Sequence, residues 1–422
     1  MSKISQYIKL YIKEHRNLVE SFLSLSILNA VDILLPLITL PYLVRTVGLA
    51  KYGAYSIVYT VIQYILLISA YGFNYTTTKQ IAQNKNNIQY VREVFHSTII
   101  ARIFISLPSI VLGLVFTYFV YPIDYTLMYL GGIGIILGNI LNPVWLFQGY
   151  EKMRYMTYVN VVCKLFFTVL IFIFIKGESD YVYITLLNSC GFVISGLLSY
   201  YIAFRIFDLK FTKVTWVSVA CQIKEGWSIF LSTVFMNLYR NSNIFLLGFF
   251  VSDYGVGLYS AAEKVVKAVQ SVTAPVSNAL FPYLSASFKG RPTSDCALQI
   301  LSINRKIGYL FAGGTVLFFL AAGIINQVFF GNTDPKITEL MRWMSPVLII
   351  GSMNYVLGIA GLVNLNYNWY FLKAVTVSGL ISMLALMITV KALDIYSGAL
   401  SMLLAEVILF YYCYIKLRKE SK

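Results

Sequence analysis

The sequence predicts an all-α integral membrane protein. Of its 422 residues, 58% are hydrophobic and only 12% are charged, and the mean hydropathy is +0.72. Soluble domains carry about 25% charged residues. The hydrophobic residues gather into repeated runs of about 20, long enough for a helix to cross a hydrocarbon core of about 30 Å. We therefore expect each run to be a membrane-spanning helix.

Twelve runs of this kind divide the chain into two predicted bundles of six helices. The bundles are expected at 18–204 and 227–415. A cytoplasmic linker at 205–226 joins them, and a cytoplasmic tail follows at 416–422. The predicted spans are 18–40, 52–71, 97–121, 126–147, 157–175, 182–204, 227–251, 256–284, 307–330, 344–364, 371–391 and 395–415.

The N-terminal segment and the loop charges predict the orientation. Residues 1–17 place Ile4, Ile8 and Ile12 on one helical face, which predicts an interfacial helix on the inner leaflet. Of the 33 Lys and Arg residues, 21 fall in the termini and even-numbered connections, six in the odd-numbered connections and six inside spans. This asymmetry follows the positive-inside rule and predicts two cytoplasmic termini. It also explains the net charge of +15 without a nucleic-acid partner.

Residue types for catalytic and metal sites are scarce. His15 and His96 are the only histidines, and the five cysteines show no paired spacing, so we expect no disulfide and no metal site. The chain has no G-x-x-x-x-G-K-[ST] phosphate loop, so we expect no ATP hydrolysis and no bound cofactor. The Gly134-x-x-x-Gly138 pair lies inside a span and predicts close helix packing. A carrier or channel is therefore favoured over an enzyme.

A short internal repeat supports two related halves. YGAYS at 52–56 and VGLYS at 256–260 each begin the second span of a half, 204 residues apart. Internal repeats are the usual construction of secondary transporters, with the substrate site between the halves.

Four longer stretches carry further information. They are LLPLITLPYLVRTVGLAKYGAYS (34–56), YGFNYTTTKQIAQ (71–83), NPVWLFQGYEKMRYMT (142–157), and VGLYSAAEKVVKAVQ with ALFPYLS around the eighth span at 256–284. These stretches resemble bacterial O-antigen flippases, the Wzx-type polysaccharide transporters, and the resemblance keeps its order along nearly the whole chain. It implies the V-shaped fold of the multidrug/oligosaccharidyl-lipid/polysaccharide exporter superfamily, with two six-helix bundles.

The resemblance also implies a function. Such a protein would move undecaprenyl-pyrophosphate-linked O-antigen repeat units from the cytoplasmic to the outer leaflet of the bacterial inner membrane by alternating access. Its partners would be this lipid-linked oligosaccharide, the membrane lipids and other polysaccharide-assembly membrane proteins. If a gradient drives the transport, a proton or a sodium ion is the candidate coupling ion.

Charged residues inside the spans are the candidate site residues, because a charge at the bilayer centre costs at least ~2.5 kcal/mol. Cations outnumber acids, which suits an anionic diphosphate. The cations are Arg102, Lys164, Arg240, Lys264, Lys267 and Lys373, and the acids are Asp32, Glu263 and Glu406.

Depth separates the cations. Arg102 and Lys373 lie near the cytoplasmic ends of their spans, so we expect them to extend to the headgroups. Three others, Arg240, Lys264 and Lys267, lie too deep for this and are predicted to bind substrate. Two further candidates are Lys164, about two turns inside its span, and Arg45, which follows span one on the outer side and could equally be an interfacial anchor.

The acids are candidates for ion coupling. Glu263 and Lys267 have the favoured i, i+4 order of a helical ion pair. Either the two charges simply neutralise each other, or Glu263 holds Lys267 in place until phosphate competes for it. Asp32 lies four residues before Pro36, which can free backbone carbonyls and break the helix. A carboxylate with freed carbonyls could form a proton or sodium site, and the alternative is a polar contact with another helix. Glu406 in span twelve is the third candidate.

Two other functions stay open on the sequence alone. A cation-coupled exporter of small molecules or drugs, from the same superfamily, would want a cavity lined by acids. A membrane enzyme such as an O-antigen polymerase would want a large outer loop, and none is expected here.

Overall fold

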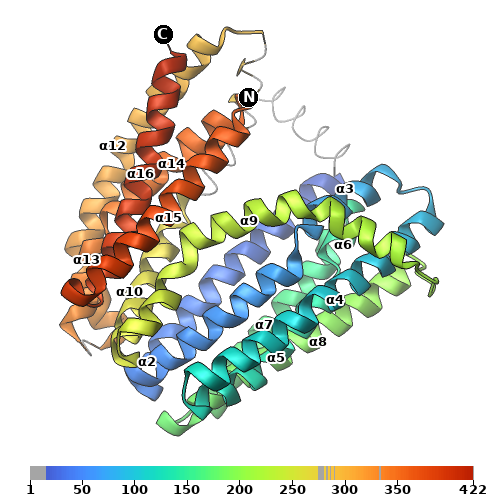
Figure 1. Ribbon diagram of the computed structural model, residues 1–422, viewed down its shortest axis with the longest axis horizontal. Coiled ribbons are helices and arrows are strands. Elements are labelled where there is room, and N and C mark those ends of the chain that lie inside the picture. The colour runs from blue at the N-terminus through green and yellow to red at the C-terminus, as the bar shows by residue number, and fades with distance from the viewer. Residues whose placement is uncertain are drawn as a thin grey trace, which may run out of the picture. The chain divides into compact units, whose positions relative to one another are not determined.

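Every element that the structure describes is helical, which confirms the all-α class (Figure 1). This computed structural model describes residues 16–421 apart from 274–279, 282–283, 286, 289 and 332–333, and side chains from residue 20 onward except that of Phe22. Most of the predicted interfacial helix at 1–17 therefore lies outside the described residues. The first half holds α2 (Arg16–Ala70), α3 (Phe73–Gln83), α4 (Ile88–Val120), α5 (Ile123–Leu141), α6 (Val144–Gly149), α7 (Met153–Phe174), η1 (Glu178–Val182) and α8 (Tyr183–Ile206). The second half holds α9 (Trp216–Phe250), α10 (Asp253–Gln270), α12 (Thr293–Ile325), η2 (Asn326–Phe330), α13 (Pro335–Met344), α14 (Pro346–Tyr355), η3 (Val356–Val363), α15 (Asn368–Leu393) and α16 (Tyr396–Glu420).

Among the described residues, nine helical segments are long and apolar enough to cross a membrane. The first of them, Leu23–Gln83, is 61 residues long and covers most of predicted span one and all of predicted span two. Helix α9 covers nearly all of predicted span seven and α10 covers the first half of predicted span eight, but neither is among the nine. The chain is therefore a multi-pass membrane protein, and the count of twelve spans stays a prediction.

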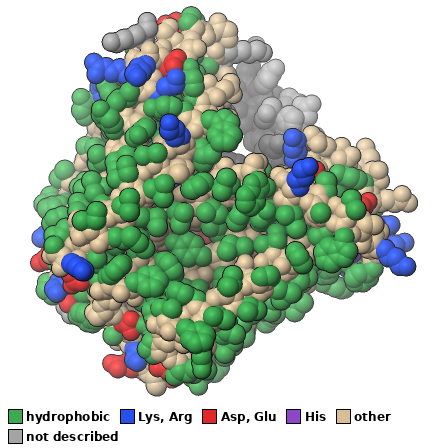
Figure 2. Space-filling model, viewed as in Figure 1, with side chains coloured by type: hydrophobic (Ala, Val, Ile, Leu, Met, Phe, Trp, Pro, Cys, Tyr) green, Lys and Arg blue, Asp and Glu red, His purple; other side chains and the backbone are tan. Residues whose placement is uncertain are grey.

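Helix α8 shows how these helices divide their surface. It exposes large side chains such as Leu197 and Ile194, and hydrophobic side chains cover much of the face in Figure 2. It buries small residues, among them Ser189 and Gly196. This distribution suits a helix surrounded by lipid, where close packing and hydrogen bonds, rather than the hydrophobic effect, hold helices together.

The predicted packing through Gly134 and Gly138 is confirmed. A methyl group on Gly138 would lie 2.2 Å from the backbone of Phe192 in α8, and one on Gly134 would lie 2.9 Å from the side chain of Ser189. Helices α5 and α8 therefore touch almost backbone to backbone.

Contacts divide the chain into two compact units, and the division does not follow chain order. The first unit comprises Met1–Thr39 and Val61–Thr233, and the second comprises Leu40–Thr60 and Val234–Lys422. The middle of α2 thus packs with helices from the far half of the sequence. The predicted bundle boundaries at 18–204 and 227–415 stay a prediction.

The expected break of the first helix beside Asp32 is wrong. Helix α2 keeps helical backbone angles through Pro36, and its one non-helical residue is Gly48, at φ 79° and ψ 163°. The Thr39 hydroxyl donates to the carbonyls of Leu35 and Pro36 at 3.1 and 3.2 Å, which supplies polar partners beside the proline. The chain turns at Gly48 because a positive φ costs a glycine little.

In the second unit, α14 runs directly into η3, a segment of π-helix over Val356–Val363. Such widened turns are rare and occur frequently at functional sites. Tyr355 and Ile359, at the start of this segment, both line the pocket described below.

Candidate functional site

The second unit brings five predicted site residues together on α9, α10 and α16, namely Arg240, Glu263, Lys264, Lys267 and Glu406. Lys267 of α10 lies at the centre of one group. Its ammonium is 3.1 Å from Glu263 Oε1, and it donates to the Arg240 carbonyl at 3.0 Å and to Asn241 Oδ1 at 3.1 Å. Glu263 is only 2% exposed and also accepts from the Tyr259 hydroxyl at 3.2 Å. The three donors of the ammonium are matched by three acceptors.

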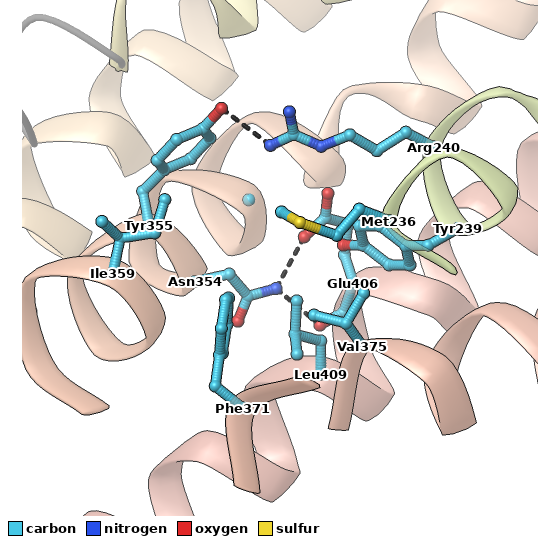
Figure 3. Close-up of a pocket in the computed structure, with 11 residues that line it drawn as sticks. Met236, Tyr239, Arg240, Asn354, Tyr355, Ile359, Phe371, Val375, Glu406 and Leu409 are labelled. Atoms are coloured by element: carbon cyan, nitrogen blue, oxygen red, sulfur yellow. Dashed lines mark hydrogen bonds between the residues drawn. The ribbon is translucent and has the colours of Figure 1, made fainter. Parts of the chain in front are cut away.

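Arg240 and Glu406 line one pocket in this unit (Figure 3). The Arg240 guanidinium donates to the Tyr355 hydroxyl at 2.7 Å, and its centre is 5.3 Å from the tyrosine ring centre. On the other side of the pocket, Asn354 Nδ2 donates to Glu406 Oε2 at 2.6 Å, and Gln270 Nε2 donates to Glu406 Oε1 at 3.4 Å. The pocket therefore combines a cation and a buried carboxylate that is held by neutral amides.

Lys264 points to a different neighbour from Lys267. Its ammonium donates to the Tyr52 hydroxyl at 2.5 Å and lies 4.9 Å from the Tyr52 ring centre and 5.7 Å from that of Tyr55. Aromatic faces attract a cation without neutralising it. Within the described part of the chain, Lys264 and Arg240 have no carboxylate oxygen within 4 Å. Neither cation therefore forms an ion pair there, although Arg240 shares its pocket with the Glu406 carboxylate.

Arg45 lies apart from this group, at an exposed position of the second unit. It donates to the Val328 carbonyl in η2 at 2.6 Å, and its guanidinium also lies next to Gly331, the residue that follows η2. A cation at the C-terminal end of a helix binds unpaired carbonyls and is favoured by the helix dipole. This contact gives Arg45 a helix-capping role in addition to the predicted ones.

The first unit holds one ion pair between predicted residues. Asp32 of α2 accepts from the ammonium of Lys164 in α7, and this ammonium also lies 5.6 Å from the ring centre of Phe192. The Asp32 side chain is 47% exposed and that of Lys164 is 21% exposed. The pair joins the first helix to the fifth predicted span, so a candidate substrate residue and a candidate coupling residue are in direct contact.

The expectation that Arg102 extends to the headgroups is wrong. Arg102 is only 3% exposed. Its guanidinium donates to the carbonyls of Ser69 and Ile140 at 3.2 and 3.3 Å and to Asn139 Oδ1 at 2.6 Å. Ser69 and Ile140 lie near the ends of α2 and α5. Arg102 is thus a buried clamp that satisfies carbonyls at two helix ends.

Sequence reasoning missed the neutral partners of the site. Tyr52, Gln270, Asn354 and Tyr355 orient the charged groups but carry no charge of their own. One signal was available, because Asn354 and Tyr355 interrupt an apolar run in predicted span ten. Polar residues inside spans are costly, so they mark candidate sites as charged ones do.

Comparison with known proteins gives the family. Residues 18–288 match the family model described as polysaccharide biosynthesis protein. The chain belongs to this family. Over 390 residues, it is 26% identical to "Putative O-antigen transporter" of Escherichia coli strain K12, covering 90% of this chain and 92% of the relative. A protein of the same name from Shigella dysenteriae is 29% identical over 275 residues, 63% of this chain and 67% of the relative.

Solved structures agree on the fold of this family member. The lipid II flippase MurJ, in an inward closed conformation, matches with a TM-score of 0.74 at 13% identity, covering 96% of this chain and 89% of MurJ. An inward-facing multidrug resistance transporter of the MATE family matches with a TM-score of 0.72 at 14% identity, covering 94% of this chain and 97% of that one. The exporter fold predicted from the sequence is therefore confirmed.

Proposed function

We propose that this polysaccharide biosynthesis family member is a flippase for undecaprenyl-pyrophosphate-linked O-antigen units. It would carry them from the cytoplasmic to the outer leaflet of the bacterial inner membrane by alternating access. The names of the Escherichia coli and Shigella relatives support this cargo. A lipid-linked cargo is also handled by MurJ, a protein of the same fold.

The observation that carries the proposal is that Arg240 and Lys264 form no ion pair among the described residues and donate to tyrosine hydroxyls instead. A diphosphate needs fixed positive charge to leave the headgroup region, and both cations are held by tyrosine hydroxyls rather than by carboxylates. A hydroxyl is a neutral acceptor, so an anionic phosphate oxygen forms the stronger hydrogen bond and replaces it. Lys267 holds α9 and α10 in register beside them, and Lys164 and Arg45 are secondary contacts for the cargo.

We propose that a proton or sodium gradient drives transport through the buried or paired acids. Asp32 exchanges its ion pair with Lys164 for a bound proton or sodium ion, and Glu406 exchanges its amide partners in the same way. Glu263 contributes by fixing Lys267. Membrane lipids surround the transporter, and other polysaccharide-assembly membrane proteins receive its product.

A drug exporter of the same fold is the weaker reading. It would bind cationic molecules through acids open to the cavity. Here Glu263 and Glu406 are 2% and 9% exposed and are already engaged by Lys267 and Asn354. Arg240 and Lys264, the site cations that form no ion pair among the described residues, oppose a cationic cargo.

Binding of undecaprenyl pyrophosphate to the purified chain tests the proposal. A charged hydrogen bond contributes ~1.5–3 kcal/mol, so Arg240→Ala and Lys264→Ala should each weaken binding about 10- to 150-fold. Lys373→Ala is the matched control, because it removes an exposed cation from a predicted span without touching this group. Undecaprenyl monophosphate should bind more weakly to the unsubstituted chain and respond less to either substitution. Unchanged affinity in both alanine variants would refute the cationic site.

A further inference from the structure

The two copies of the internal repeat meet in the structure. YGAYS and VGLYS both belong to the second unit, and the Ser260 hydroxyl donates to the Ser56 hydroxyl at 2.9 Å. These serines occupy equivalent positions 204 residues apart in the chain. Both are buried, at 3% exposure for Ser56 and 0% for Ser260.

The glycines of the repeat pack in the same reciprocal way. A methyl group on Gly53 would lie 1.8 Å from the Asp253 carbonyl oxygen, and one on Gly257 would lie 2.0 Å from the Leu49 carbonyl oxygen. Leu49 and Asp253 are themselves equivalent positions of the repeat. The glycine of each copy therefore packs against the equivalent carbonyl of the other copy, as a local two-fold axis requires. Glycines permit this backbone contact because they have no side chain.

Lys264 adds a polar contact one turn along α10 from Ser260. It reaches back across the same crossing to the hydroxyl of Tyr52, the first residue of the other copy. The crossing, defined here as residues 49–56 with 253–264, thus combines glycine contacts, a serine pair and a lysine that the proposed function assigns to the diphosphate.

We propose that this crossing is the outer gate of the transport path and that an arriving diphosphate releases it. The predicted topology places residues 45–51 and the start of α10 at the outer side. Glycine contacts give a tight seal yet contribute only short-range dispersion, which is lost after a small separation. A phosphate that takes Lys264 from Tyr52 removes a polar contact of the closed state. This proposal rests on the proposed function, because a gate needs that cargo.

A reversible cross-link tests the gate. Ser56→Cys and Ser260→Cys together, in a chain whose five native cysteines are replaced, should form a disulfide under a mild oxidant in cells. Surface O-antigen should then be lost and should return on reduction. The control is Thr77→Cys with Thr98→Cys, whose hydroxyls lie 3.4 Å apart between α3 and α4. That pair should cross-link without loss of O-antigen.

The outcomes separate the gate from the proposed function. If the cysteine-replaced chain without the new pair fails to restore O-antigen to a strain lacking the gene, the proposed function fails first. If it restores O-antigen and the cross-linked repeat pair does so too, the gate is refuted. Failure of the repeat pair to cross-link would refute the contact itself.

A second variant tests the same gate without a cross-link. Gly257→Ala places a methyl group against the Leu49 carbonyl, so the crossing should stay parted. A cysteine at position 260 should then react faster with a membrane-impermeant maleimide added outside the cells, and O-antigen should fall at normal membrane abundance. Gly323→Ala is the matched control, because no described residue lies within 4 Å of a methyl group there. Unchanged labelling with normal O-antigen in Gly257→Ala would overturn the proposal.

Discussion

Removing the Lys267 ammonium should destabilise the chain more than removing the whole ion pair. Lys267→Ala leaves Glu263, whose side chain is 3% exposed, with the Tyr259 hydroxyl as its remaining partner of those described above. Breaking a buried pair from one side costs about 3–5 kcal/mol. The Lys267 side chain is itself 32% exposed, so the pair is not fully buried and we expect the lower end, about 3 kcal/mol. That loss lowers the ratio of folded to unfolded protein about 150-fold.

The double variant Glu263→Gln/Lys267→Gln removes both charges and keeps polar side chains at both positions. Neutral hydrogen bonds contribute about 0.5–1.5 kcal/mol each, so the double variant should stay within about 1 kcal/mol of the unsubstituted chain. Membrane abundance and the temperature of aggregation in detergent measure both effects. A Lys267→Ala variant as stable as the unsubstituted chain, or a double variant as unstable as the single one, would refute this reasoning.

The same pair of variants decides between the two roles of Lys267. Its three donors are matched by Glu263, Arg240 and Asn241, so we expect a positioning role. The double variant should then display O-antigen at normal abundance. Loss of O-antigen from a well-folded double variant would instead show that phosphate takes Lys267 from Glu263 during transport.

Three further predictions concern topology, coupling and packing. Reporter fusions at residue 422 and within 331–343 should report opposite sides of the membrane, and reports from the same side would remove the twelve-span topology. Asp32→Asn should abolish gradient-driven transport while membrane abundance stays close to that of the unsubstituted chain, because the asparagine amide can still accept from Lys164; unchanged transport would leave Asp32 a packing contact. Gly138→Ala should destabilise the chain by about 1–3 kcal/mol through overpacking against α8, measured as aggregation temperature beside the neutral control Gly323→Ala. Equal temperatures for those two variants would contradict the packing argument.

The sequence by itself determined the features that depend on local composition. Runs of about 20 apolar residues predict helices because only a helix pairs its backbone within one segment in lipid. The Glu263–Lys267 pair was likewise readable, since residues four apart share a helix face, and it forms at 3.1 Å. The glycine spacing at Gly134 and Gly138 predicted close packing for the same local reason.

The tertiary structure alone decided what each charge meets. Depth in a span placed Arg102 near the headgroups, but whether it reaches water or neighbouring carbonyls depends on helices that the pattern does not locate. Asp32 pairs with Lys164, which lies 132 residues away in the chain, and Arg240 donates to Tyr355, which lies 115 residues away. The repeat was visible in the sequence, but the contact between Ser56 and Ser260 was not. Hydropathy reports the preference of each helix for lipid, whereas helix pairing depends on side-chain shape and hydrogen bonding between segments that the sequence does not place side by side.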